Sequence, residues 1–208
     1  MACSFQRPSP QKEPKPRVVI ACEGEKTERG YFEDLNLSEK LTSVDVLLLE
    51  HRGTDPRSVV GQVAEFVKIE RHLQGWRKDD TAWAVFDGDE HRQTPGQLVN
   101  WNSAIQQARD LKINLAISNP SFEFWYLLHY QDQTRFLHRD QAMATLRNHL
   151  GQYEKHHRIY SSLQERTDHA IRRAKIIHDR AIRNDVDIYE NPCCMGVAKL
   201  VEKLLSLR

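Results

Sequence analysis

The sequence predicts an α/β protein with a Rossmann-like, four-stranded parallel sheet, helices on both faces, and a C-terminal helical appendage. Four short apolar runs alternate with segments of helical periodicity up to about residue 120, and only helical patterns follow. Strands that alternate with helices are joined by crossovers, which make the strands parallel and cover both faces of the sheet. At 208 residues the chain can form one such core, whereas a second full domain is not expected.

The predicted strands are short apolar runs bounded by turn residues, a pattern typical of strands buried on both faces. Residues 1–16 contain half of the prolines and few apolar side chains, which predicts a flexible tail before the first strand. The four predicted strands are Arg17–Cys22, Val44–Glu50, Ala82–Phe86 and Ile113–Ile117.

Helical patterns occupy the gaps between these strands. Thr27–Leu37 carries apolar residues along one side, and Ser58 is predicted to cap a second helix after the turn at 53–57. Thr94 and Gln97 have capping-box spacing, with a proline between them at the first helical position. This signal predicts a third helix ending near Leu111.

From Ser121 onward the pattern predicts helices only. We therefore divide the chain into a Pro-rich tail (1–16), an α/β domain (17–130) and a helical extension (131–208). The helices expected after the last strand are Ser121–Tyr130, Gln141–Leu150, Leu163–Ile182 and Val197–Leu207.

The formal charge of +1 conceals a separation of charge along the chain. Between Arg135 and Arg183 there are 11 Lys+Arg against five Asp+Glu, a net of +6, so the remainder sums to −5. A basic surface near an acidic site suits a polyanion, although a solvated helix face is the alternative. The candidate nucleic-acid-binding residues here are Arg172, Arg173, Lys175, Arg180 and Arg183.

Other classes of protein are disfavoured by what the sequence lacks. Its apolar runs are far shorter than the roughly 18 residues of a membrane span, and the start shows no secretory signal. Its four cysteines form no C-x-x-C pair, which disfavours a zinc site or a disulfide framework. We therefore expect a cytoplasmic protein with reduced, packed thiols.

Carboxylates follow the first and third predicted strands. Glu23, Glu25 and Glu28 come after the first strand, and Asp87 and Asp89 come after the third. A flavodoxin-like strand order would make these strands neighbours and bring Glu23 near both aspartates, at the edge where ligands bind. Clustered carboxylates repel one another unless a cation joins them, and oxygen ligands suit Mg²⁺ or Mn²⁺. The alternative is a set of solvated loop residues.

Further polar groups lie at the same predicted edge. Lys26 and Asn119 are candidate phosphate contacts, and Glu123 is either an additional metal ligand or a helix residue without a role in the site. His91 and His129 could transfer protons near pH 7, although isolated histidines are more often packed or surface residues. Gly24 is not part of a P-loop, because the preceding glycine and spacer are missing, so direct ATP binding is not supported.

A strand ending in Glu-Gly and a later strand ending in Asp-x-Asp resemble the Toprim domain of topoisomerases, bacterial primases and OLD-family nucleases. The chain more closely resembles the RloB family, through motif blocks that span about 17 to 205. Gly88 stands where that family usually has Arg, and cysteines follow Pro192 where the family usually has Ser-Thr. The matching blocks are Cys22–Glu28 with Tyr31 and Phe32, Val85–His91, Ser118–Trp125 with Leu127–His129, Tyr153 with Lys155, and Asn191 with Pro192.

The resemblance implies a metal-dependent phosphodiesterase of prokaryotic defence against phage, often with a separately encoded ATPase partner. By Toprim analogy, Glu23 is the general acid/base or a ligand, and Asp87 and Asp89 hold Mg²⁺ or Mn²⁺. Glu25 and Glu28 are secondary ligands in this interpretation. The substrate is nucleic acid, either DNA or a structured RNA such as tRNA.

Three alternatives stay open at this point. A tyrosine such as Tyr31 could form a covalent intermediate, as in topoisomerases. The chain could instead be a non-cleaving nucleic-acid-binding or regulatory subunit of an ATPase-containing complex. A nucleotidyltransferase or primase-like polymerase is the third, but no further acidic pair or zinc module supports it.

Overall fold

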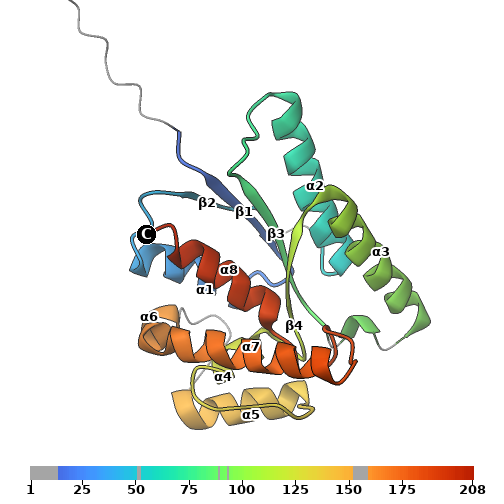
Figure 1. The fold of residues 1–208 in the computed structure, drawn as a ribbon, viewed down its shortest axis with the longest axis vertical. Helices are drawn as coiled ribbons and strands as arrows, with labels where there is room; N and C mark the ends of the chain where they lie inside the picture. The colour runs from blue at the N-terminus through green and yellow to red at the C-terminus, as the bar shows by residue number, and fades with distance from the viewer. Residues whose placement is uncertain (1–13, 51–52, 89, 93, 152–158) are drawn as a thin grey trace, which may run out of the picture.

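The sheet of this protein has four parallel strands in the order β2-β1-β3-β4 (Figure 1). The computed structural model describes residues 14–50, 53–88, 90–92, 94–151 and 159–208. This order confirms the predicted fold class and makes β1 and β3 neighbours. The strands are β1 (Arg17–Cys22), β2 (Asp45–Leu48), β3 (Thr81–Asp87) and β4 (Asn114–Ser118), each within a few residues of its predicted range.

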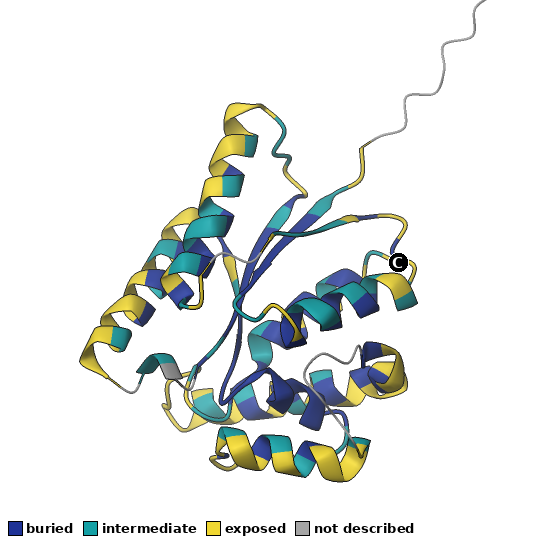
Figure 2. Cartoon of the chain, turned by 180° about the vertical axis from the view of Figure 1, so that it is seen from behind, coloured by how far each residue is buried: buried dark blue, intermediate teal, exposed yellow. Residues whose placement is uncertain are grey.

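Helices cover both faces of this sheet, with α2 and α3 on one side and α1 and α8 on the other (Figure 1). Because successive strand residues point to opposite faces, Ile20 and Val85 pack toward α1 and α8, and Ala21 and Phe86 pack toward α2 and α3. Figure 2 shows buried positions between the sheet and the helices, and exposed positions on the outward helix faces. The helices in these layers are α1 (Thr27–Ser38), α2 (Pro56–His72), α3 (Pro95–Leu111) and α8 (Met195–Leu205).

The predicted caps of the helices are right in one case and wrong in another. Thr94 caps α3, and its hydroxyl accepts from the Gln97 amide at 3.4 Å. Ser58 does not cap α2. Asp55 does, because its carboxylate accepts from the Arg57 and Ser58 amides at 3.1 and 3.2 Å and Pro56 starts the helix.

The helical part after β4 begins near the sheet edge and ends on the sheet itself. The predicted helix Leu163–Ile182 is instead three pieces, with the short turn η2 separating α6 from α7. The last helix, α8, lies so close to β4 that a side chain at Gly196 would overlap the Leu115 carbonyl. The predicted extension therefore ends as a layer of the sheet core. Its elements are α4 (Phe122–Leu127), α5 (Arg139–Leu150), α6 (Tyr160–Leu163), η2 (Gln164–Arg166) and α7 (Thr167–Arg183).

Two further expectations concern the interior and membranes. Cys22, Cys193 and Cys194 are buried free thiols, which confirms that they pack as small apolar groups. Among the described residues, no helix has the combined length and apolar character that crossing a bilayer requires.

Candidate active site

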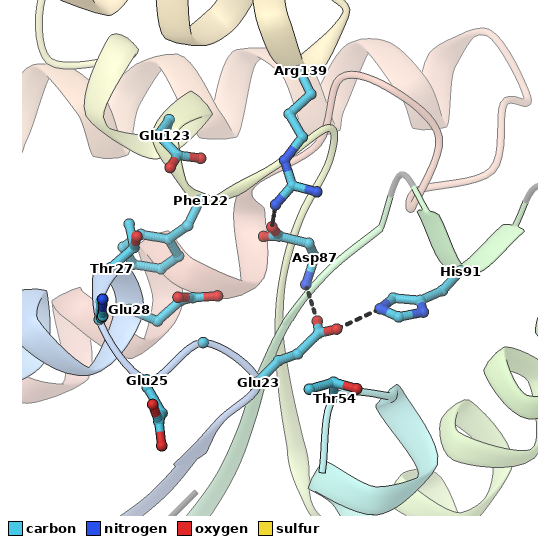
Figure 3. A pocket seen from close by; sticks show the side chains of 12 residues that line it. Glu23, Glu25, Thr27, Glu28, Thr54, Asp87, His91, Phe122, Glu123 and Arg139 are labelled. Carbon is cyan, nitrogen blue, oxygen red and sulfur yellow. Dashed lines mark hydrogen bonds and ion pairs between the residues drawn. The ribbon is translucent and has the colours of Figure 1, made fainter. Parts of the chain in front are cut away.

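A pocket of about 350 Å³ lies beyond the carboxyl ends of β1 and β3 (Figure 3). Its walls come from the turn after β1, the start of α1, Thr54 of the loop before α2, the end of β3, the short turn η1 (Glu90–Arg92), α4, and the first residue of α5. This is the edge at which ligands bind in open parallel sheets. The ionisable side chains that line it are Glu23, Glu25, Lys26, Glu28, Asp87, His91, Glu123 and Arg139.

Glu23 is fixed in this pocket by two neighbours. Its Oε2 accepts from the Asp87 backbone amide at 3.0 Å, and its Oε1 lies 2.6 Å from Nε2 of His91. Parallel pairing of β1 with β3 brings the two strand ends together, since Glu23 N donates to the Val85 carbonyl at 2.9 Å. The predicted proximity of Glu23 and Asp87 is therefore confirmed.

Asp87 is mostly buried, with 13% of its side chain exposed. Its Oδ1 accepts from the Ser118 hydroxyl at 3.0 Å, and its Oδ2 lies 3.3 Å from the Arg139 guanidinium. Burial, followed by repulsion from Glu28, Glu123 and Glu23, raises the pKa of Asp87 well above its ordinary value, although Arg139 opposes the shift. The pocket thus concentrates more negative charge than Arg139 neutralises.

Glu28 and Glu123 are the two most buried carboxylates of the pocket, 5% and 1% exposed. The Glu28 carboxylate packs so closely on the turn that any side chain at Gly24 would overlap it. Ser121 stands at the N-cap of α4, but its hydroxyl donates to Glu123 Oε2 at 2.6 Å. Two helices, the end of β3 and the turn after β1 therefore each direct one carboxylate toward the same cavity (Figure 3).

The type of donor fits a hard divalent cation. Carboxylate oxygens are the ligands that Mg²⁺ and Mn²⁺ prefer, and a cation would relieve the repulsion that, after burial, raises the Asp87 pKa. Within the described ranges, however, no three His, Cys, Asp or Glu side chains form a group ready to hold a metal. Asp89, a predicted ligand, lies outside the described residues.

The remaining predicted site residues divide between the pocket and other places. Glu25 and Lys26 are exposed at the pocket wall, and Figure 3 shows Glu25 pointing away from Asp87. Asn119 is buried, and its amide donates to the Tyr189 carbonyl at 3.0 Å, so the amide is engaged in a structural contact. Lys26 therefore lies at the pocket, whereas the Asn119 amide is bonded to the Tyr189 carbonyl.

The basic residues of α7 have different environments. Arg173 donates to Asp132 at 2.5 Å and to the Leu128 carbonyl at 2.7 Å, so it holds the connection between α4 and α5. Arg172 contacts His169 on its own helix at 3.2 Å. Three others are exposed on the helix surface, namely Lys175, Arg180 and Arg183.

Two residues weighed for chemistry are packed in the interior. Tyr31 is 1% exposed and packs against the rings of Phe122 and Trp125, which argues against a covalent tyrosine at this position. His129 is buried, and burial lowers its pKa to about 4, so it is neutral near pH 7. His91, in contrast, is a pocket residue through its contact with Glu23.

Arg139 and Ser118 are the site residues that the sequence did not single out for a role. Arg139 was counted only as one charge of the basic segment, and the helix that it begins was expected to start at 141. Ser118 lies in a matching block, immediately after the fourth predicted strand. Ligands bind at the carboxyl ends of parallel strands, and this rule, which selected Asp87, applies equally to Ser118. The position after a predicted strand was the signal that could have identified Ser118.

Comparison with known proteins gives one match. No curated protein and no solved structure matches the sequence. The model of the family described as RloB-like protein matches residues 18–204. That range includes β1 to β4, every described wall of the pocket and nearly all of α8. The chain therefore belongs to the RloB-like family.

Proposed function

We propose that this chain is a Mg²⁺- or Mn²⁺-dependent nuclease that hydrolyses phosphodiester bonds in nucleic acid. The observation that carries the proposal is the convergence of four carboxylates, Glu23, Glu28, Asp87 and Glu123, on one pocket at the carboxyl edge of the sheet. Burial and then repulsion from the other three carboxylates raise the pKa of Asp87, and a divalent cation would relieve that repulsion.

Each side chain has a role that its contacts support. When bound, the cation would polarise a phosphate and stabilise charge on the attacking and departing oxygens. Asp87, Glu28 and Glu123 would hold it, together with Asp89 of the sequence prediction. Glu23 is oriented by His91 and the Asp87 amide, and would accept a proton from the attacking water.

Arg139 adds a positive charge to the same pocket. Its guanidinium lies 3.3 Å from Asp87 Oδ2, at a position from which it could donate to phosphate oxygens. In this proposal Arg139 divides its hydrogen bonds between Asp87 and the substrate phosphate, so it binds substrate directly.

The biological setting is proposed from the resemblance to the RloB family. We propose an effector of prokaryotic anti-phage defence that acts in the cytoplasm with a separately encoded ATPase partner. Its substrate would be DNA or a structured RNA such as tRNA, and the exposed Lys175, Arg180 and Arg183 would contribute attraction for the phosphate backbone.

The test is a cleavage assay with the full chain, with and without a candidate ATPase partner. Plasmid, single-stranded DNA and total tRNA are incubated with Mg²⁺, Mn²⁺ or EDTA. The variants are Asp87→Asn and Glu23→Gln, and the control is Asp45→Asn, an exposed carboxylate at the opposite end of the sheet. Cleavage is expected with Mg²⁺ or Mn²⁺ and not in EDTA. Both site variants are expected to lose at least about a hundredfold in cleavage rate. Cutting in EDTA, or unchanged cutting by Asp87→Asn, would refute the mechanism.

One observation favours a second candidate function, a subunit that binds nucleic acid without cutting it. The described residues offer no ready group of three metal ligands, and Glu23 and Asp87 each share an oxygen with His91 or Arg139. Metal-dependent binding without cleavage, even beside the ATPase partner, would support this alternative.

A further inference from the structure

We propose that the segment Asp187–Cys193, here called the strut, is a positioning element for the candidate active site. In this proposal Asn191 is the residue that holds Arg139 opposite Asp87. The inference rests on the proposed function, because it assigns Arg139 and Asp87 to that site.

The strut is anchored firmly to the end of β4. Cys193 and Asn119 form an antiparallel bridge with two backbone hydrogen bonds of 2.9 and 3.0 Å. The Asn119 amide also donates to the Tyr189 carbonyl at 3.0 Å, and the Tyr189 ring packs on Trp101 of α3 at 5.9 Å between centroids. The strut is thereby fixed to the same sheet edge that carries the pocket.

Asn191 extends from this anchored segment to the residue before the α5 cap. Its Oδ1 accepts from the Leu137 amide at 3.0 Å, and its Nδ2 donates to the Leu137 carbonyl at 2.7 Å. The side-chain amide thus pairs with a backbone unit as a neighbouring strand would. Arg139 lies two residues later, at the start of α5, and reaches Asp87 Oδ2 at 3.3 Å.

The same strut holds the other side of the pocket through Arg92. This arginine pairs with Asp187 at 2.7 Å and Glu190 at 3.3 Å, and it lies over the Trp101 ring. Its chain neighbour is His91, whose Nε2 lies 2.6 Å from Glu23. The strut therefore contacts the chain on both sides of the pocket, next to His91, which contacts the Glu23 carboxylate, and near Arg139, which contacts the Asp87 carboxylate.

The two hydrogen bonds of Asn191 hold the backbone just before Arg139 in place. Catalytic groups must be held within fractions of an ångström, and a displacement of about 1 Å can cost a hundredfold in rate. A side chain that bonds to both the N–H and the C=O of Leu137 sets the position and the direction of the backbone at that residue. Removing it frees the start of α5, whereas the Cys193 bridge still fixes the strut itself.

The kinetic test is a double-mutant cycle. Asn191→Ala is combined with Arg139→Ala, and Asn184→Ala serves as the control that removes an exposed amide just before the strut. Asn191→Ala is expected to lower kcat by about tenfold or more in the wild-type background and by less than about twofold beside Arg139→Ala. Equal losses in both backgrounds would overturn the proposal, because Asn191 would then not act through Arg139.

A second readout does not depend on activity. Pairing with a carboxylate slows rotation of a guanidinium about its Nε–Cζ bond, and NMR of the Arg139 side chain measures that rate. Faster rotation is expected in Asn191→Ala and in Asn191→Asp, which loses the donor to Leu137, but not in Asn184→Ala. Faster rotation in the Asn191 variants would support the positioning role even if the protein cuts no substrate. In that case only the proposed nuclease function would be refuted. An unchanged Arg139 signal in both Asn191 variants would overturn the inference.

Discussion

Asp87 is a mostly buried carboxylate with three other carboxylates near it in the pocket. Burial, followed by repulsion from Glu28, Glu123 and Glu23, raises its pKa, and the Ser118 hydroxyl and the Arg139 guanidinium donate to its carboxylate. A carboxyl group whose folded pKa is raised stabilises the fold below its unfolded pKa, and this contribution is lost as the pH rises through the folded pKa. Without a cation, the ionised Asp87 therefore opposes folding near neutral pH.

We expect Asp87→Asn to stabilise the metal-free protein at pH 7.5. The amide can still accept from Ser118 and carries no charge, so a gain on the order of 1 kcal/mol, or about 2–4 °C in Tm, is expected. The difference should vanish at about pH 3, below the ordinary pKa of an aspartate, where the carboxyl group is protonated in both states. Thermal unfolding in EDTA measures it, with Asp45→Asn as the control, and a lower Tm for Asp87→Asn at pH 7.5 would contradict the explanation.

Gly24 leaves the space that the Glu28 carboxylate occupies beside the turn. A methyl group at Gly24 would overlap that carboxylate and displace it from the pocket. We expect Gly24→Ala to weaken Mn²⁺ binding about tenfold or more, the usual effect of disturbing groups around a metal site. Isothermal titration measures the affinity.

The control for Gly24→Ala is Gly30→Ala in α1. A side chain at Gly30 meets nothing within 4 Å, and alanine favours the helix by roughly 0.5–1 kcal/mol. Gly30→Ala should keep metal affinity and raise stability slightly. Equal metal affinity in Gly24→Ala and the wild type would show that Glu28 is not a ligand.

At the scale of elements, α8 packs directly on one face of the sheet and is part of its hydrophobic core. Val197, Leu200, Val201 and Leu204 are all fully buried against the face that also receives α1. Their helical spacing predicted the element, but no local signal indicated which surface it covers. Gly196 allows the first turn of α8 to meet the β4 backbone directly.

Gly196→Ala should therefore destabilise the protein by overpacking. The overlapped atoms at this position are backbone atoms of β4, which cannot move as a flexible side chain can. The expected loss is about 1–3 kcal/mol in the free energy of unfolding, measured by urea denaturation. Gly61→Ala on α2, where a side chain meets nothing within 4 Å, is the matched control. A similar small gain in both variants would refute the packing argument.

Two helix boundaries, the start of α2 and the interruption at η2, were predicted wrongly. Ser58 and Asp55 both have residue types typical of caps, and only the observed backbone shows that Pro56 already begins α2. The interruption at η2 falls within a run that reads as one helix from 163 to 182. Local propensity does not determine which of two suitable cap residues starts a helix, or whether a helical run is interrupted. Packing against the rest of the protein decides both.

At the scale of the whole molecule, the pocket carboxylates and the exposed basic side chains of α7 form two separate groups. The carboxylates gather at the pocket, whereas Lys175, Arg180 and Arg183 are exposed on α7. The net charge of +1 is therefore compatible with the polyanionic substrate that we propose, because the exposed basic residues of α7 lie apart from the pocket carboxylates. An electrostatic contribution of this kind weakens as salt concentration rises.

Replacing Lys175, Arg180 and Arg183 together by serine should weaken nucleic-acid binding and reduce its salt dependence. If all three contact phosphates, the slope of log K against log salt should fall by about 2 to 3. Fluorescence anisotropy with labelled DNA and RNA measures both quantities. The control replaces Arg57, Lys68 and Arg71, three exposed basic residues of α2 on the other face of the sheet. An equal effect in the control would show that α7 has no specific role.

By itself, the sequence determined the order of strands and helices, the four apolar runs of the sheet, and the carboxylates at the ends of β1 and β3. These features are local, because burial and hydrogen bonding impose periods of 2 and 3.6 residues on neighbouring positions. Only the tertiary structure decided that Arg139 pairs with Asp87, that His91 pairs with Glu23, and that Asn191 holds Leu137. Those pairs are separated by more than fifty residues, and no local period encodes a contact made when distant segments pack together.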